Sequence, residues 1–193
     1  MNPYCIEINL KLHPLMDDFD PLLLPEIRHQ LLDVKTFLNP QIEKLLDDLG
    51  VYIFMIEAFS EWIPYSKTHI HIDAGGTDIS KINWIFGGSD SSNQWYQIKS
   101  EKSGTASNTT ANTGSTRFDI NDVEKILYTH PAGPNPFIFQ AAIPHKAVLG
   151  KERRCCISIL PKWKSNNKRL TYSECTNLLQ SYLVAGPGLE PRT

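Results

Sequence analysis

Three side chains that bind metal ions well lie two residues apart in residues 66–76, which read SKTHIHIDAGG. They are His69, His71 and Asp73, and the alternation of polar and apolar residues around them predicts a β-strand. Side chains at i, i+2 and i+4 of a strand project to the same side of it. The pattern therefore gathers two imidazoles and a carboxylate on one face, and this set of donors is typical of a metal site.

A further ligand has to come from another part of the chain. His13 and His29 lie where helices are expected and default to solvent-facing or capping roles, and His130 lies in the turn-rich segment THPAGPNP. His145, in AAIPHKAV, follows a β-rich run and is the best partner for the histidine and carboxylate of residues 66–76. Two histidines and one carboxylate on one side of a metal are typical of non-haem Fe(II) oxygenases. Zinc hydrolases also combine three ligands with an open position, so the donor set leaves the metal undecided.

A basic residue beyond His145 bears on that choice. Arg154 begins the alternating run RCCISI, so Arg154, Cys156 and Ser158 are expected to share one face of a strand. An arginine on the inner face of a β-barrel needs an anionic partner, and a carboxylate fits its planar fork of donors. A dicarboxylic co-substrate would supply that partner. The doublet Arg153-Arg154 leaves the inward arginine open by one residue, and we favour Arg154 because it begins the alternating run.

The composition sets the class of protein. The chain has 193 residues, of which 41% are hydrophobic and 21% charged, and this suits one globular domain with its own core. A formal charge of -2 gives no reason to expect a nucleic-acid or anionic-membrane partner. Cys5, Cys155, Cys156 and Cys175 form no CxxC pair and favour reduced thiols. With no basic-then-apolar leader and no apolar run of about 20 residues, we expect a soluble, cytoplasmic protein.

The N-terminal part, residues 1–50, is expected to form a strand and a helical flank. Residues 4–12 alternate like a strand, and Ile27, Leu31, Val34 and Leu38 repeat at helical spacing. Asn39-Pro40 then resembles an N-cap and first helical residue, for a helix that ends at Gly50.

From residue 51 to residue 161 the chain contains six or more short apolar and aromatic runs separated by turn residues, a pattern that predicts an antiparallel β-sandwich or jelly roll. Residues 99–116 are polar and rich in Ser, Thr, Asn and Gly, which indicates an exposed loop. Within residues 162–184, Thr171 to Glu174 fit a capping box at the start of a C-terminal helix that continues to Val184. Residues 185–193 are expected to be a disordered tail of this single domain.

The segments HIHIDAGG, KINWIFGG, QWYQI, IPHKAV and RCCISI, taken together over residues 51–161, resemble the Fe(II)/2-oxoglutarate-dependent dioxygenase superfamily, in particular its aspartyl-hydroxylase-like members. The resemblance implies a double-stranded β-helix, a cupin-like jelly roll, with flanking helices. It implies that His71, Asp73 and His145 bind Fe(II), that Arg154 pairs with the far carboxylate of 2-oxoglutarate, and that Asn83 and Ser158 line the co-substrate pocket. The implied reaction uses O2 to hydroxylate a peptidyl or small-molecule substrate and releases succinate and CO2.

Two other classes of function stay open at this level. A cupin-like metal protein or isomerase without 2-oxoglutarate chemistry predicts an exposed Arg154. A non-enzymatic β-sandwich interaction domain predicts that the histidines do not converge. His69 could complete a cupin-like His-x-His site, but the positions that would then hold a Glu are Ala74 and Gly75. We therefore favour a hydrogen-bonded role beside the metal for His69.

Overall fold

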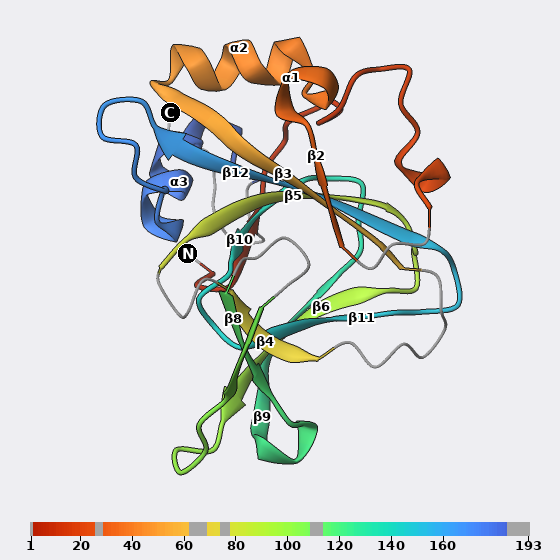
Figure 1. The fold of residues 1–193 in the computed structure, drawn as a ribbon, viewed down its shortest axis with the longest axis vertical. Coiled ribbons are helices and arrows are strands. Elements are labelled where there is room, and N and C mark those ends of the chain that lie inside the picture. Colours follow the sequence, from red (N-terminus) through yellow and green to blue (C-terminus); the bar gives the residue numbers. More distant parts are fainter. Residues whose placement is uncertain (1, 26–28, 62–68, 74–77, 109–113, 185–193) are drawn as a thin grey trace.

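The structure, a computed structural model, describes residues 2–25, 29–61, 69–73, 78–108 and 114–184 (Figure 1). Within these residues the chain is mainly β, with strands in two six-stranded sheets whose neighbouring strands all run antiparallel. The first sheet has the order β1 (Cys5–Glu7), β10 (Phe137–Gln140), β5 (Ser80–Gly87), β12 (Arg154–Trp163), β3 (Val51–Glu61) and β2 (Gln30–Leu32). The second has the order β7 (Thr105–Asn108), β8 (Gly114–Phe118), β4 (Ile70–Asp73), β11 (His145–Val148), β6 (Ser92–Ile98) and β9 (Val123–Pro131).

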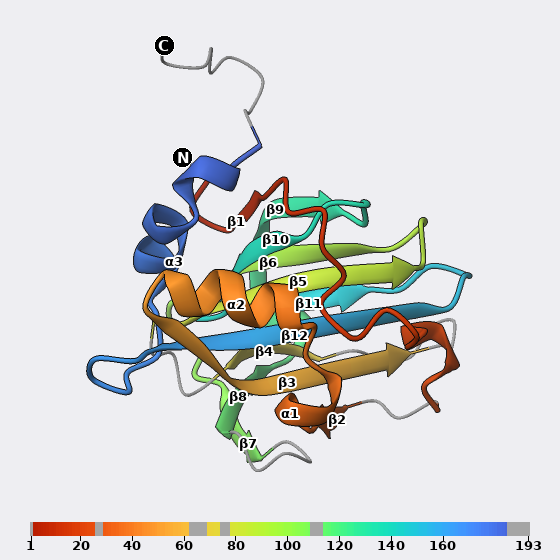
Figure 2. The same ribbon diagram turned by 90° about the horizontal axis from the view of Figure 1, so that it is seen from above.

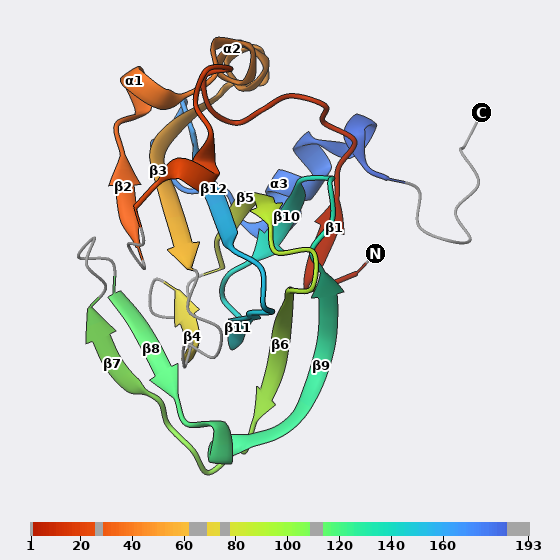
Figure 3. The same cartoon turned by 90° about the vertical axis from the view of Figure 1, so that its right-hand side faces the viewer.

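The helices are short and lie beside the first sheet. They are α1 (Val34–Phe37), α2 (Pro40–Asp48) and α3 (Tyr172–Leu178), with single 3-10 turns at η1 (Pro21–Leu23), η3 (Ile120–Asp122) and η4 (Gln180–Tyr182). Figure 3 shows α1 and α2 on the side of the first sheet that faces away from the second, and Figure 2 shows α2 lying over the strands. Among the described residues, no helix has the length and apolar character that crossing a membrane requires.

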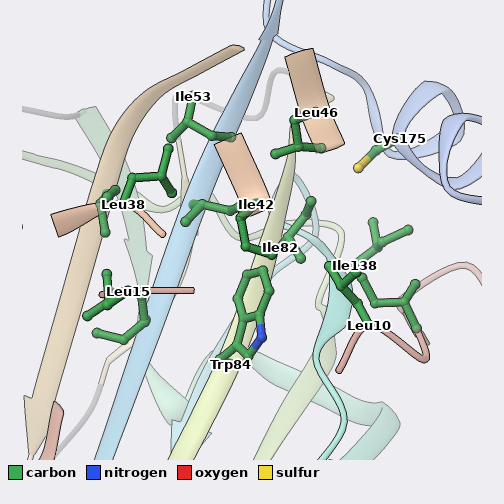
Figure 4. Close-up of a cluster of buried hydrophobic side chains, with 14 of the residues drawn as sticks. Leu10, Leu15, Leu38, Ile42, Leu46, Ile53, Ile82, Trp84, Ile138 and Cys175 are labelled. Atoms are coloured by element: carbon green, nitrogen blue, oxygen red, sulfur yellow. The ribbon is translucent and has the colours of Figure 1, made fainter. Parts of the chain in front are cut away.

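The main hydrophobic core lies between the first sheet and these helices. Ile42 and Leu46 of α2 are buried against a cluster that includes Ile82 and Trp84 of β5 (Figure 4). On β12, Ile157 belongs to the same cluster, whereas its neighbours in sequence point the other way. The outer face of the first sheet is therefore apolar, as a face covered by helices should be.

The inner face of the first sheet, which faces the second sheet, has a different composition. Strand alternation places Glu57, Lys81, Asn83, Arg154 and Ser158 on this side, and all five are buried. A second, smaller cluster of buried apolar residues fills one part of the space between the sheets; it is formed by Cys5, Ile79, Trp95, Phe137, Phe139 and Ala141. The rest of that space is lined with ionisable and amide groups.

Several elements agree with the sequence. Helix α2 begins after Asn39, whose side chain accepts the Gln41 N–H at 2.8 Å, and Gly50 follows it at φ +77°. The capping box at Thr171 and Glu174 is present, and the two side chains each accept a backbone N–H of the other residue. Helix α3 ends at Leu178, however, and only the turn η4 follows, so the helix is shorter than the predicted run to Val184.

Other predictions were wrong. Of the helix expected from Ile27 to Leu38, residues 26–28 lie outside the described residues. The rest forms the edge strand β2 and the single turn α1, and Leu31, expected on the apolar face, is 48% exposed. The N-terminal strand spans only β1. Part of the predicted loop 99–116, residues 105–108 and 114–116, belongs to the paired strands β7 and β8. Residues 109–113 lie outside the described residues, as does the predicted tail 185–193.

Candidate metal centre

The predicted ligands lie on two neighbouring strands of the second sheet. His71 and Asp73 belong to β4 and His145 to β11, and His71 and His145 are direct partners in the antiparallel pairing of these strands. Side chains of directly paired residues point to the same face. The two imidazole rings are accordingly 4.5 Å apart between centroids, and one ligand atom from each of the three residues lies within 4.8 Å of the others.

Backbone carbonyls orient both imidazoles. Nδ1 of His71 lies 2.9 Å from the carbonyl oxygen of His69, and Nδ1 of His145 lies 2.8 Å from that of Ile143. A carbonyl can only accept, so each Nδ1 donates its hydrogen and each Nε2 keeps a free lone pair. The Nε2 atoms are 3.5 Å and 3.9 Å from the nearest oxygens of Asp73, on which both histidines converge. This is how histidine ligands of metal ions are usually held.

Burial and charge fix the protonation of the same groups. Burial, and secondarily the neighbouring His71, lowers the pKa of His145 to about 3, so its imidazole is neutral at pH 7. Burial by itself would raise the pKa of Asp73, but the ammonium of Lys81 and then the two histidines hold it well below its usual range. The site therefore presents a neutral buried imidazole and a carboxylate. A second imidazole, on His71, has its side chain 33% exposed. These residues fit a divalent metal ion such as Fe(II) or Zn(II).

A buried ion-pair network continues from Asp73 into the first sheet. Nζ of Lys81 lies 2.8 Å from Oδ2 of Asp73 and 2.7 Å from Oε2 of Glu57, whose other oxygen lies 3.2 Å from Nε2 of His29. His29 was expected to face solvent or to cap a helix, and that expectation is wrong, because it is 9% exposed. Neither Lys81 nor Glu57 was predicted from the sequence. A single charged residue inside the apolar run VYIFMIEAF was the available signal for Glu57.

Arg154 lies in the same space between the sheets. It is 3% exposed, and its guanidinium crosses to the second sheet, where one NH2 group donates to Oδ1 of Asn93 at 3.1 Å. Trp95 of β6 is the residue paired with His145. Asn93 lies two residues from Trp95 on the same strand, a separation of about 7 Å. The Nε of Arg154 has no hydrogen-bond partner, and no carboxylate of the described residues lies within ion-pair distance of it.

Arg153 points elsewhere. Its guanidinium donates to the carbonyl of Leu24 and to Oγ of Ser60, at 3.4 Å from the latter. The two arginines of the doublet therefore have different surroundings, and Arg154 is the one directed toward the second sheet. Within the described part of the chain, the Arg154 guanidinium bonds one neutral amide. A buried charge without a counter-ion costs several kcal/mol, so an anion that joined this guanidinium would be stabilised there.

The two remaining predicted site residues sit between Arg154 and Lys81. Asn83 and Ser158 are direct partners in the pairing of β5 with β12, and they are 5% and 1% exposed. Oδ1 of Asn83 has no hydrogen-bond partner. Ser158 is also the register partner of Glu57 on its other side. Both side chains thus lie on the polar inner face of the first sheet.

The other histidines do not join the triad. His69 is exposed and contributes its backbone carbonyl to His71. His13 bonds the backbone of Leu15 and lies against Phe86. His130, predicted in a loop, belongs to β9 and packs on Phe137, with Glu7 3.9 Å from its Nε2. Neither a protein-family model nor a curated protein sequence matches the chain.

Proposed function

We propose that this chain is an Fe(II)- and 2-oxoglutarate-dependent dioxygenase that hydroxylates a peptidyl or small-molecule substrate and releases succinate and CO2. The observation that carries the proposal is the pairing of two features in one space between the sheets. One is the triad of His71, Asp73 and His145. The other is the buried Arg154, which among the described side chains bonds a neutral amide and no carboxylate.

The order of the strands supports the proposal. From β3 the chain runs to β4, β5 and β6, alternating between the sheets, and after β9 it alternates again through β10, β11 and β12. This gives facing four-stranded layers, β10-β5-β12-β3 and β4-β11-β6-β9, which is the arrangement expected of a jelly roll, or double-stranded β-helix. The hairpin of β7 and β8 and the strands β1 and β2 extend the edges of these layers.

The residues have separate roles in the proposed reaction. Iron held by the triad would supply, with 2-oxoglutarate and O2, the oxidative chemistry of the reaction. His71, Asp73 and His145 hold the ion, and Arg154 pairs with the far carboxylate of the co-substrate. Asn83 and Ser158 line the space between these two ends.

The alternatives make different demands on Arg154 and the histidines. A cupin-like metal protein without 2-oxoglutarate chemistry predicts an exposed Arg154, whereas the residue is 3% exposed. A non-enzymatic interaction domain predicts separated histidines, whereas the rings of His71 and His145 are 4.5 Å apart. Both observations favour the dioxygenase.

The proposal is tested by anaerobic titration of the protein with Fe(II) and 2-oxoglutarate. We expect a weak metal-to-ligand charge-transfer band in the visible, followed by succinate formation when O2 is admitted. The Asp73→Ala variant should lose iron and the band together, because the carboxylate is the only anionic ligand. Iron binding without a band and without succinate would overturn the dioxygenase and leave a cupin-like metal protein; no iron binding would favour the interaction domain.

A further inference from the structure

Lys81 occupies an unusual place for a cation, because it touches the one carboxylate expected to bind a divalent metal. Its ammonium lies 2.8 Å from Oδ2 of Asp73 and 2.7 Å from Oε2 of Glu57, and the side chain is 8% exposed. A lone buried ammonium beside a metal would be strongly unfavourable. Glu57, whose side chain is 3% exposed, offsets that charge.

The two sheets hold this arrangement rigidly. Lys81 and Glu57 belong to β5 and β3 of the first sheet, on either side of β12, and Asp73 belongs to β4 of the second. Strand β12 lies between β3 and β5, and its residue in register with Glu57 is Ser158. Because the Ser158 side chain is small, the Lys81 ammonium and the Glu57 carboxylate can meet above β12. The ion pairs therefore tie the metal-binding carboxylate to the opposite sheet.

The two oxygens of Asp73 are consequently not equivalent. Oδ2 accepts from Lys81 at 2.8 Å and lies 3.9 Å from Nε2 of His145, while Oδ1 faces Nε2 of His71 at 3.5 Å. An oxygen engaged by an ammonium at this distance is a weaker metal ligand than its partner, and rotation of the carboxylate to present both oxygens would break the contact with Lys81.

We propose that Lys81, itself held by Glu57, is a positioning residue that reserves Oδ2 of Asp73 and so makes Asp73 bind the metal through Oδ1 alone. The inference rests on the proposed function for its metal site, and it adds the reason why three coordination positions stay open. A carboxylate that chelated through both oxygens would fill one of them. Lys81 touches neither substrate nor metal in this scheme and acts through Asp73.

The test counts exchangeable water on Mn(II), which serves as the paramagnetic probe for the site in the full-length protein. Three protein ligand atoms on a six-coordinate ion leave three water positions, and a chelating Asp73 would leave two. We expect water-proton relaxation of wild-type Mn(II) protein to report three. In the double variant Lys81→Met/Glu57→Gln, which removes the ammonium and its counter-charge together, we expect the inner-sphere relaxation enhancement to fall by about one third while Mn(II) stays bound.

The control is Lys81→Arg, which keeps a charged donor at the same position and should retain the wild-type enhancement. A wild-type protein with only two exchangeable waters would overturn the inference, and this measurement stands even if the double variant does not fold. A folded double variant with unchanged enhancement would also overturn it and leave Lys81 a structural residue. The inference would be supported, and the proposed function overturned, by three waters in the wild type and two in the variant together with no 2-oxoglutarate chemistry. A wild type that binds no Mn(II) would overturn the inference.

Discussion

His145 couples the stability of the metal-free protein to pH. Unfolded histidine takes up its proton near pH 6.5, whereas burial lowers the pKa of His145 in the folded protein to about 3. Between these values the unfolded chain binds one more proton, so the free energy of unfolding falls as pH falls, on the order of 1 kcal/mol per pH unit. Asp73 acts in the same direction at lower pH. Its pKa is lower in the folded protein than in the unfolded chain, so its contribution to the free energy of unfolding is lost as the pH falls below the usual pKa of an aspartate.

We therefore expect urea unfolding in the presence of a chelator to show a steep loss of stability from pH 6.5 to pH 4. The variant His145→Asn should flatten that part of the curve, because an amide does not titrate. His69→Asn, at an exposed position just before the neighbouring strand β4, is the control for loss of an imidazole outside the buried centre. An identical slope in wild type and His145→Asn would contradict the assignment of the acid sensitivity to His145.

The two adjacent arginines form a matched pair for testing the co-substrate pocket. A buried charge-assisted hydrogen bond is worth roughly 1.5 to 3 kcal/mol, so Arg154→Ala should raise the 2-oxoglutarate concentration required by about 10- to 100-fold without loss of iron. Arg153→Ala should leave co-substrate affinity unchanged, because Arg153 bonds Leu24 and Ser60 instead. Titration of the charge-transfer band measures both, and the reverse pattern would assign the pocket to Arg153.

The turn between β5 and β6 positions Arg154 through one glycine. Gly88 has φ +57°, and a Cβ placed on it would lie 2.7 Å from Cβ of Arg154 and 3.1 Å from Oγ of Ser91. Gly88→Ala should therefore destabilise the protein by about 1–3 kcal/mol and weaken 2-oxoglutarate binding, because the arginine must shift. Gly133→Ala, with no atom within 4 Å of the added Cβ, is the control. Chemical unfolding and the charge-transfer titration check both effects; unaltered co-substrate binding in Gly88→Ala would show that Arg154 tolerates the shift.

The elements that could be predicted are those fixed by local chemistry. Asn39 and Pro40 begin α2, and Thr171 and Glu174 begin α3, because capping depends on residues within one turn. The strand β2 could not be predicted, because its pairing with β3 is a tertiary contact that overrides helical spacing. The polar composition of residues 99–116 indicated little burial, but it says nothing about backbone pairing, which builds β7 and β8.

Tertiary contacts also limited what could be predicted of the candidate metal centre. His71 and Asp73 were readable because they lie on one strand, and His145 and Arg154 because the residue order suggested them. Lys81 and Asn93 were not, because Lys81 meets Asp73, and Asn93 meets Arg154, across the space between the two sheets. Sequence periodicity indicates which side of a strand a residue faces, and the facing layer decides what it meets.

The main apolar core and the buried ionised groups lie on opposite faces of the first sheet. The outer face carries the main apolar core under α2, and the inner face carries the ionised groups around Asp73. Ile42→Ala, at a fully buried position of α2, should therefore lower the free energy of unfolding by about 2–5 kcal/mol. Because Ile42 does not face the second sheet, the Mn(II) affinity of the folded variant should match that of the wild type.

The matched control is Ile126→Ala on β9, where the side chain is 53% exposed and the change in stability should stay within about 0.5 kcal/mol. Urea unfolding with chelator measures the free energy of unfolding, and Mn(II) titration at low temperature measures the metal affinity. If the two faces are independent, Ile42→Ala changes the free energy of unfolding and leaves the Mn(II) affinity unchanged. If metal affinity fell in step with stability in Ile42→Ala, the core under α2 would have to set the position of Asp73 through Lys81 and Glu57, and the first sheet would act as one coupled layer.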